Sequence, residues 1–266
     1  MGRIESCFES LRSKGEKGLI TFITAGDPSI ENTLDYMQSL VDGGADVIEL
    51  GVPFSDPMAD GPTIQRASER SLAAGTDLSS IFMLVRTFRE RNASTPVILM
   101  GYMNPFERLG FERFAKEAKA SGVDGVLVVD LPPEESVPQN KILTLNGVRQ
   151  IFLIAPNSSE DRIKKVGELA AGFIYYVSVK GVTGDKSIST SNIRNSLELV
   201  RKGTRLPIGL GFGIKTPESA REAAKLSDAV VVGSALVDII EKETEVNAAR
   251  KALESFVKEL KGAVDA

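Results

Sequence analysis

Apolar residues follow two different spacings, which alternate along the chain. Short and almost wholly apolar runs occupy residues 19–26, 46–52, 96–103, 125–130, 149–156, 173–181, 207–213 and 229–234. Runs of this kind predict strands that are buried on both faces of a parallel sheet. Amphipathic stretches with helical spacing lie between them, at residues 29–44, 80–92, 111–122, 159–172 and 216–227. Several of these stretches begin with Ser, Thr or Asp and end with Gly, as capped helices do.

The order of these elements predicts an α/β protein. Strands that alternate with helices, without a linker or a shift in composition, favour a closed (β/α)8 TIM barrel over an open doubly wound sheet. We expect a single TIM-barrel domain over residues 1–266. Near the N-terminus, Ile4, Cys7, Phe8 and Leu11 form one apolar stripe. This stripe predicts an additional N-terminal helix that closes the N-terminal mouth of the barrel, with Cys7 serving in packing.

Composition and charge exclude several classes of protein. The formal net charge is -4 and basic residues are scattered among acidic ones, so the sequence offers no surface for nucleic acid or for anionic lipid. No segment approaches the roughly 20 apolar residues of a membrane span, and the first residues lack the apolar core of a secretion signal. The single cysteine cannot form an internal disulfide. We therefore expect a cytoplasmic location.

Histidine is absent from the sequence. The commonest general base and the commonest metal ligand are thereby removed, and one cysteine cannot supply a zinc site. We expect no metal, and any acid–base chemistry must use Asp, Glu, Tyr or Lys.

Glu49 is a carboxylate inside the second predicted strand, DVIELGV. Residues 48, 50 and 52 are apolar and alternate with residues 47, 49 and 51, so the apolar set is expected to face the helices and Glu49 the barrel interior. An acid in so apolar a place should have a raised pKa, as a working general acid does. The alternative is a buried ion pair, for which Lys180 at the end of the sixth strand is the obvious partner.

Two further residues have both a structural and a functional interpretation. Asp60 directly precedes Gly-Pro, where an Asp commonly caps a helix that has Pro at an early position, so it is either a cap or a catalytic group. Tyr175 in the sixth strand is by default a core aromatic whose hydroxyl needs one partner.

Glycine-rich turns follow the last three predicted strands. Gly213 follows the seventh strand, Gly233 and Ser234 follow the eighth, and the turn at residues 181–184 follows the sixth. Backbone N–H groups at such turns and at helix starts bind phosphate, and barrel enzymes often place phosphate there. The alternative is that these glycines only tighten turns. The small polar residues 181–192 suit either a lid over a substrate or a simple flexible connection.

Several motifs in these loops resemble those of the tryptophan synthase alpha chain family, in order and with matching spacing from about Arg3 to Lys261. They are TFITAGDP (21–28), ELGVPFSDPMADGPTIQ (49–65), MGYMNP (100–105), VVDLPPEES (128–136), IAPNS (154–158), GVTG (181–184), GFGI (211–214) and VVGSALV (231–237). The block from 49 to 65 is highly specific, whereas GFG and GS occur in many phosphate-binding barrels.

The resemblance implies retro-aldol cleavage of indole-3-glycerol phosphate to indole and glyceraldehyde 3-phosphate, a late step of tryptophan biosynthesis. It gives Glu49 the proton-transfer role and places Asp60 against the indole N–H, where its charge stabilises the ring cation. It makes Tyr175 the third catalytic residue, beside the substrate, where it helps to position Glu49 or the glycerol portion.

The family match also assigns binding residues. The implied indole pocket is Phe22, Met100, Tyr102, Leu127, Leu153 and Phe212. The implied phosphate loops contain Gly184, Gly213, Gly233 and Ser234. The implied interface with the family's beta chain contains Asp56, Pro57, Asn104, Pro105 and Asp130. That beta chain carries pyridoxal phosphate and forms an α2β2 heterotetramer with the alpha chain, which needs no cofactor of its own.

One departure and two rival functions accompany the resemblance. This chain has Val179-Lys180 where the better-known members have Arg followed by a small residue, which bears on the salt links of the following loop. Because Lys180 ends the sixth strand, the closest rival is a Schiff-base phosphosugar aldolase with Lys180 as its reactive lysine. The other rival is a non-catalytic barrel that only binds a partner protein.

Overall fold

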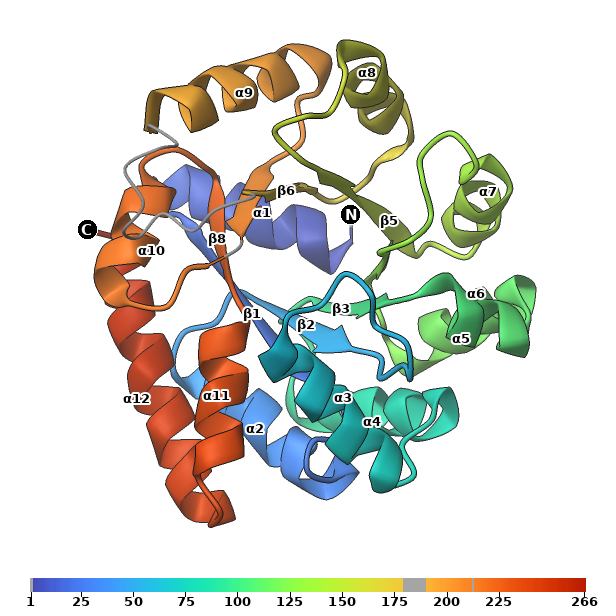
Figure 1. Ribbon diagram of the computed structural model, residues 1–266, viewed down its shortest axis with the longest axis vertical. Helices are drawn as coiled ribbons and strands as arrows, with labels where there is room; N and C mark the ends of the chain where they lie inside the picture. The colour runs from blue at the N-terminus through green and yellow to red at the C-terminus, as the bar shows by residue number, and fades with distance from the viewer. Residues whose placement is uncertain (1, 179–189, 212) are drawn as a thin grey trace.

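Eight parallel strands form a closed barrel in the order of the sequence (Figure 1). The computed structural model describes residues 2–178, 190–211 and 213–266, apart from the side chains of residues 190–192. The strands are β1 (Gly18–Thr24), β2 (Val47–Gly51), β3 (Val97–Gly101), β4 (Gly125–Val128), β5 (Arg149–Ile154), β6 (Ile174–Val177), β7 (Ile208–Gly211) and β8 (Ala229–Val232). Strand β8 pairs with β1 and closes the ring, which confirms the predicted TIM barrel.

The helices other than α1 surround the ring of strands, and α1 lies across one end of it (Figure 1). Those of the described part are α1 (Arg3–Lys14), α2 (Ile30–Asp42), α3 (Pro62–Ala73), α4 (Leu78–Arg91), α5 (Met103–Leu109), α6 (Phe111–Ser121), α7 (Val137–Leu145), α8 (Glu160–Leu169), α9 (Thr190–Gly203), α10 (Pro217–Ala224), α11 (Ser234–Lys242) and α12 (Val246–Val264). Local signals set several ends: Ser29 accepts the Asn32 N–H before α2, and Gly15 at φ 72° ends α1.

The predicted strands are longer than the observed ones at the rim of the barrel. The run at residues 96–103 was expected to be wholly strand, yet β3 ends at Gly101 and α5 begins at Met103. Tyr102 lies between these two elements. Its side chain is only 3% exposed although it is not part of a strand. An apolar run therefore marks burial and does not by itself mark where a strand ends.

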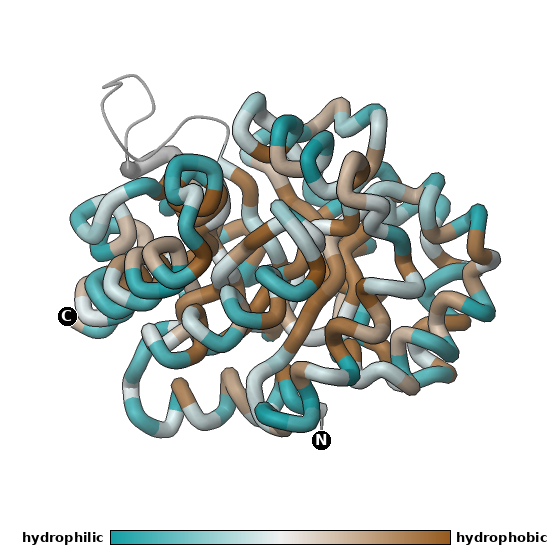
Figure 2. Tube along the Cα trace, turned by 90° about the horizontal axis from the view of Figure 1, so that it is seen from below, coloured by the Kyte–Doolittle hydropathy of each residue, from teal (hydrophilic) through white to brown (hydrophobic). Residues whose placement is uncertain are grey.

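Alternating side chains divide the core into two layers. One layer fills the barrel and includes Ile20, Val47, Ile98 and Ile151, whereas residues 48, 50 and 52 pack between the strands and the helices. Figure 2 shows apolar residues along the strands and hydrophilic ones on the outer helix surfaces. Helix α1 closes the N-terminal mouth of the barrel, as predicted, and its Ile4, Phe8 and Leu11 pack on the interior layer.

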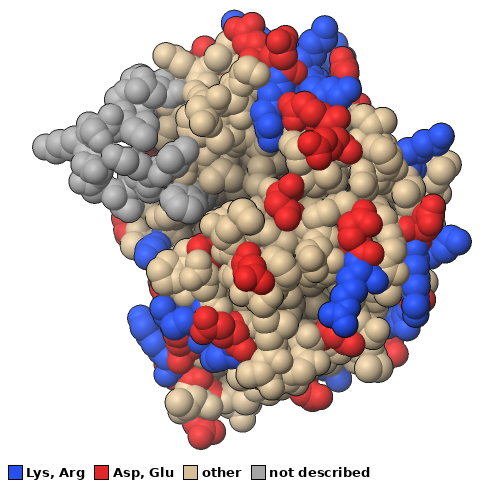
Figure 3. Space-filling model, turned by 45° about the vertical axis from the view of Figure 1, so that its right-hand side comes forward, with Lys and Arg blue, Asp and Glu red and all other residues tan. Residues whose placement is uncertain are grey.

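Surface charges are mixed. On the face drawn in Figure 3, lysine and arginine side chains lie among acidic ones and form no continuous basic patch. Within the described residues, no helix is long and apolar enough to cross a membrane.

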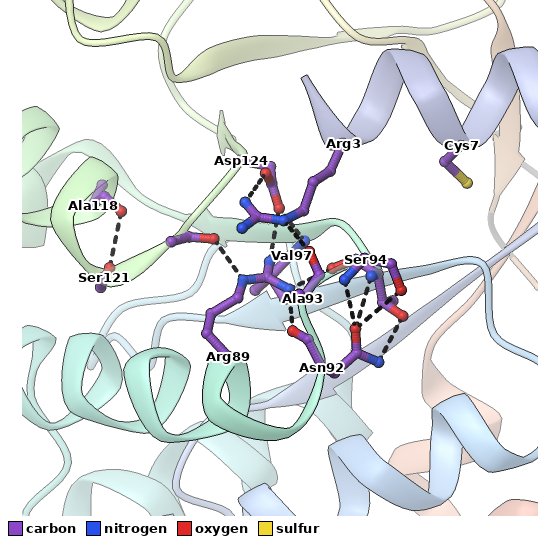
Figure 4. Close-up of polar contacts among 12 residues, drawn as sticks. Arg3, Cys7, Arg89, Asn92, Ala93, Ser94, Val97, Ala118, Ser121 and Asp124 are labelled. Carbon is purple, nitrogen blue, oxygen red and sulfur yellow. Dashed lines mark hydrogen bonds and ion pairs between the residues drawn. The ribbon is translucent and has the colours of Figure 1, made fainter. Parts of the chain in front are cut away.

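Asp124 ties helix α1 to the base of the barrel (Figure 4). Its Oδ1 accepts from Arg3 of α1 at 2.9 Å, and its Oδ2 accepts from Arg89 of α4 at 2.8 Å and from the Val97 N–H at 2.9 Å. The Asp124 side chain is only 8% exposed, so these bonds replace the water that burial removed. These bonds to Asp124 stabilise the N-terminal end of the barrel, which lies opposite the loops that follow the strands.

Candidate active site

A cavity lies at the carboxyl ends of β1, β2 and β3, where barrel enzymes build their active sites. It is lined by Phe22, Thr24, Gly51, Val52, Asp60, Ile64, Ser68, Met100, Gly101, Tyr102 and Val129. The volume available to the centre of a water molecule is about 10 Å³, so the described residues pack closely around this cavity.

Glu49 lies directly beneath this cavity. It pairs in register with Phe22 of β1 and stands two residues before Gly51 on the same side of β2, and both neighbours line the cavity. The Glu49 side chain is fully buried, and neither of its oxygens has a hydrogen-bond partner among the described residues. Loss of hydration raises the pKa of Glu49 to about 8, so the acid is protonated at neutral pH. Lys180, the partner in the ion-pair interpretation, lies outside the described residues.

Asp60 does not cap helix α3, so the cap interpretation is wrong. The N-cap is Gly61, in an extended conformation and without a side-chain cap bond, and Pro62 opens the helix. The Asp60 carboxylate turns instead toward the barrel, where Oδ2 accepts from the Tyr102 hydroxyl at 3.0 Å. Burial raises the pKa of Asp60, and the bond from Tyr102 acts in the opposite direction.

The Tyr102 hydroxyl holds the loop as well as the carboxylate. It accepts the Ala59 N–H at 3.0 Å while it donates to Asp60. The side chain of Gln65 adds a bond of 2.8 Å to the carbonyl oxygen of Asp60. Asp60 is therefore fixed from both sides of the loop, and Tyr102, predicted only as a pocket residue, also orients it.

Tyr175 completes the group. It lies on β6 beside Leu153 and Gly209, with its ring turned to the barrel interior. The pKa of Tyr175 is raised well above its ordinary value, first by burial and then by the negative charges of Glu49 and Asp60. A Cβ at Gly211 would lie 2.6 Å from the Tyr175 hydroxyl, so only glycine leaves room for this ring. The three predicted catalytic side chains therefore converge on one end of the barrel.

The predicted indole-pocket residues fall into two groups. Phe22, Met100 and Tyr102 line the cavity, whereas Leu127 and Leu153 belong to the barrel interior, where they pair in register with Met100 and Tyr175. Phe212 lies outside the described residues. Ile64 and Ser68 also line the cavity and were not predicted from the sequence. They follow Asp60 at intervals of four residues, and this helical spacing was the signal that could have identified them.

The predicted phosphate residues that are described lie after β7 and β8. Gly213 has a φ of +74°, which favours glycine, and Ser234 begins α11. A Cβ at Gly233 would lie 3.4 Å from Phe22, so this turn borders the cavity wall. Gly184 lies outside the described residues. Over the described chain, no three acidic or cysteine side chains are grouped to hold a metal ion.

The predicted interface residues follow β2, β3 and β4: Asp56, Pro57 and Asp130 lie in loops, whereas Asn104 and Pro105 lie in the first turn of α5. Asp56, Asn104 and Asp130 are exposed, while Pro57 and Pro105 are half-buried. Among them, Asp130 accepts the Met103 N–H at 2.7 Å and so braces the start of α5. The neighbouring Met58 is 82% exposed, a large apolar side chain in water beside these residues.

Comparisons with known proteins agree with this geometry. The sequence model of the tryptophan synthase alpha chain family matches residues 8–265. A tryptophan synthase alpha chain from Burkholderia ambifaria is 52% identical over 265 residues, covering 100% of this chain and 97% of that protein. The crystal structure of tryptophan synthase subunit alpha from Legionella pneumophila superposes with a TM-score of 0.93 at 40% identity, covering 100% and 99% of the two chains.

A chain of the tryptophan synthase α2β2 complex from Pyrococcus furiosus also superposes. Its TM-score is 0.85 at 40% identity, over 93% of this chain and 99% of that one. The buried Glu49 and the cavity that Asp60 borders are consistent with these comparisons. The similarity extends over the full length in both sequence and structure, and it shows that this chain belongs to the tryptophan synthase alpha chain family.

Proposed function

We propose that the chain, as a tryptophan synthase alpha chain, is a lyase that cleaves indole-3-glycerol phosphate to indole and glyceraldehyde 3-phosphate. The observation that carries the chemistry is the buried Glu49, without a partner in the described part, beneath a cavity bordered by Asp60. A neutral acid and an ionised acid at the two ends of one aromatic ring are what this cleavage needs.

Glu49 supplies the proton that starts the cleavage. Protonation of indole C3 makes the ring an electron sink, a base takes the proton of the adjacent glycerol hydroxyl, and the carbon–carbon bond breaks as the aldehyde forms. The bond's electron pair returns to the ring, which leaves as indole. A pKa of about 8 keeps the Glu49 proton available at neutral pH.

Asp60 stabilises the positive charge that forms on the ring. Its carboxylate accepts the indole N–H, and the Tyr102 hydroxyl, which donates to Oδ2 at 3.0 Å, holds the carboxylate in place. Tyr175 limits the position of Glu49 and of the glycerol portion. Phe22 and Met100 contact the ring, and Leu127 and Leu153 of the barrel interior complete its apolar surroundings.

The phosphate group is held by backbone N–H groups at the turns after β7 and β8. Gly213, Gly233 and Ser234 supply them, and the start of α11 adds the favourable end of the helix dipole. Phe212 and Gly184 keep their proposed roles in the indole pocket and the phosphate site. None of these steps uses a cofactor, so we propose that the chain needs none and that pyridoxal phosphate belongs to the beta partner.

The test of the chemistry is indole release by the wild type and by Glu49→Gln. The variant keeps the volume of the side chain but cannot deliver a proton, so we expect a loss of about 10²–10⁴-fold in kcat. Glu5→Gln, at the opposite end of the barrel, is the matched control and should stay near wild type. Equal rates for wild type and Glu49→Gln would refute the role of Glu49. Borohydride trapping of substrate on Lys180 would instead support the Schiff-base alternative.

A tryptophan synthase beta chain is the proposed partner, in an α2β2 assembly. The exposed Met58, with Asp56, Asn104 and Asp130 around the same rim, supports a docking surface beside the cavity mouth. Co-purification with the beta chain should fail for Met58→Asp and succeed for Met83→Asp, because Met83 is also exposed but lies on α4. Binding of both variants alike would argue against this surface. The cytoplasmic location stays a prediction.

A further inference from the structure

Helices α3 and α11 are joined by a row of polar and charged side chains. Thr63 Oγ1 of α3 donates to Asp238 of α11 at 3.0 Å. One turn further, Arg66 makes two bonds of 2.6 Å to the two carboxylate oxygens of Glu241. Arg70 donates to the same carboxylate at 2.8 Å. Because bidentate arginine pairs fix both distance and orientation, the row sets how far α3 sits along α11.

The row continues to the barrel itself. Arg70 makes two further bonds of 2.7 Å to Asp27, which follows β1 and is 1% exposed. Beneath the charges, Ala67 of α3 and Val237 of α11 pack with Phe22 of β1, and both are fully buried. Apolar contacts, with ion pairs beside them, therefore hold the two helices to each other and to β1.

Each helix carries one end of the candidate site. Helix α3 begins at Pro62, two residues after Asp60, and its Gln65 holds the Asp60 carbonyl oxygen at 2.8 Å. Helix α11 begins at Ser234, in the proposed phosphate turn. A shift of one helix along the other would change the span between these two ends.

We propose that Arg66, Arg70 and Glu241 are positioning residues that set the distance between the indole end of the site at Asp60 and the phosphate end at Ser234. This inference rests on the proposed function. None of the three needs to touch the substrate. A ligand that spans both ends binds more tightly than its separate halves only while the two ends keep a fixed separation, since the second contact then forms at a high effective concentration.

Glu241→Ala is the decisive variant. It disconnects α11 from both arginines but leaves the Arg70–Asp27 pair intact, so no buried carboxylate loses its partner. Glu241→Gln keeps one amide oxygen as an acceptor and should give an intermediate effect. The control is Glu117→Ala, which breaks the 2.8 Å Arg86–Glu117 pair between α4 and α6, away from the site.

The assay compares a spanning ligand with its halves on the full-length chain. Affinities are measured for indole, for glycerol 3-phosphate and for an indolylpropyl phosphate. We expect Glu241→Ala to leave both halves within about 2-fold of wild type and to weaken the spanning ligand by about 10-fold, with a similar fall in kcat/KM. The control should change none of these values.

The outcomes separate this inference from the proposed function. If folded Glu241→Ala binds the spanning ligand as wild type does, or weakens all three ligands equally, the positioning role is overturned. Should Glu241→Ala fail to fold, Glu241→Gln decides by the same criterion. If the wild type neither binds the spanning ligand nor cleaves indole-3-glycerol phosphate, the proposed function fails first and this inference falls with it.

Discussion

Burial of Glu49 makes the stability of this protein depend on pH in a way that one substitution can remove. The pKa of Glu49 is raised from 4.5 to about 8 in the folded chain because burial strips the carboxylate of water. In the unfolded chain the group ionises near its ordinary value. Between these two values the folded state holds one proton more than the unfolded state, so its stability falls as pH rises.

The magnitude follows from the two pKa values. Glu49→Gln is neutral at every pH, and its amide meets the same partner-free surroundings in the described part of the site. The variant should therefore match wild type below the unfolded pKa and then gain about 1.4 kcal/mol per pH unit. The gain is about 1 kcal/mol at pH 5.5 and about 4 kcal/mol at pH 7.5, and it levels off near 5 kcal/mol once pH exceeds the folded pKa.

Urea unfolding at several pH values between 5.5 and 9 measures this difference. Glu259→Gln, at an exposed position on α12, controls for the substitution itself. The variant that loses catalysis should be the more stable protein, by an amount that grows with pH and then stops growing. A difference that is constant with pH, or a Glu49→Gln protein less stable than wild type at pH 7.5, would refute the assignment of Glu49 as a buried neutral acid.

Further predictions concern activity, stability and reactivity. The kcat/KM of the wild type should fall as pH rises through about 8, because ionised Glu49 cannot donate its proton; a flat alkaline profile would contradict this. Tyr102→Phe should keep the fold but lower kcat/KM by roughly 10-fold, since Asp60 loses the hydroxyl that holds it; an unchanged value would show that the loop alone suffices. Asp124→Ala should cost about 3–5 kcal/mol in urea unfolding, because the mostly buried Arg89 loses its only carboxylate partner among the described residues and the Val97 N–H loses its side-chain acceptor; a cost under about 1 kcal/mol would show that water or the carbonyl oxygens around Arg89 suffice. Cys7 should resist iodoacetamide at pH 8 until urea unfolds the chain, because burial raises its pKa to about 12; fast labelling of the native protein would contradict that burial.

The spacing of apolar residues predicted much of the fold. The apolar runs marked every strand of the barrel, and the stripe at Ile4, Phe8 and Leu11 marked the helix that closes its mouth. Helices α5 and α7 were not anticipated, because one is short and follows directly on an apolar run, and the other has little contrast between its faces. Helix α9 was missed although Ile193, Leu197 and Val200 follow helical spacing, because the polar residues before it read as a loop.

The alternation of strands with helices predicted the barrel, and the alternation within β2 predicted the side on which Glu49 lies, because both patterns are read from neighbouring residues. The surroundings of each acid, in contrast, depend on residues that are distant in the chain. Asp60 read equally well as a helix cap, and the contact with Tyr102, forty-two positions away, decided against it. The row from Asp27 through Arg70 to Glu241 was likewise absent from any local pattern, because it joins residues that only barrel closure brings side by side. Periodicity records the environment of one element, whereas contacts between elements depend on how all of them pack.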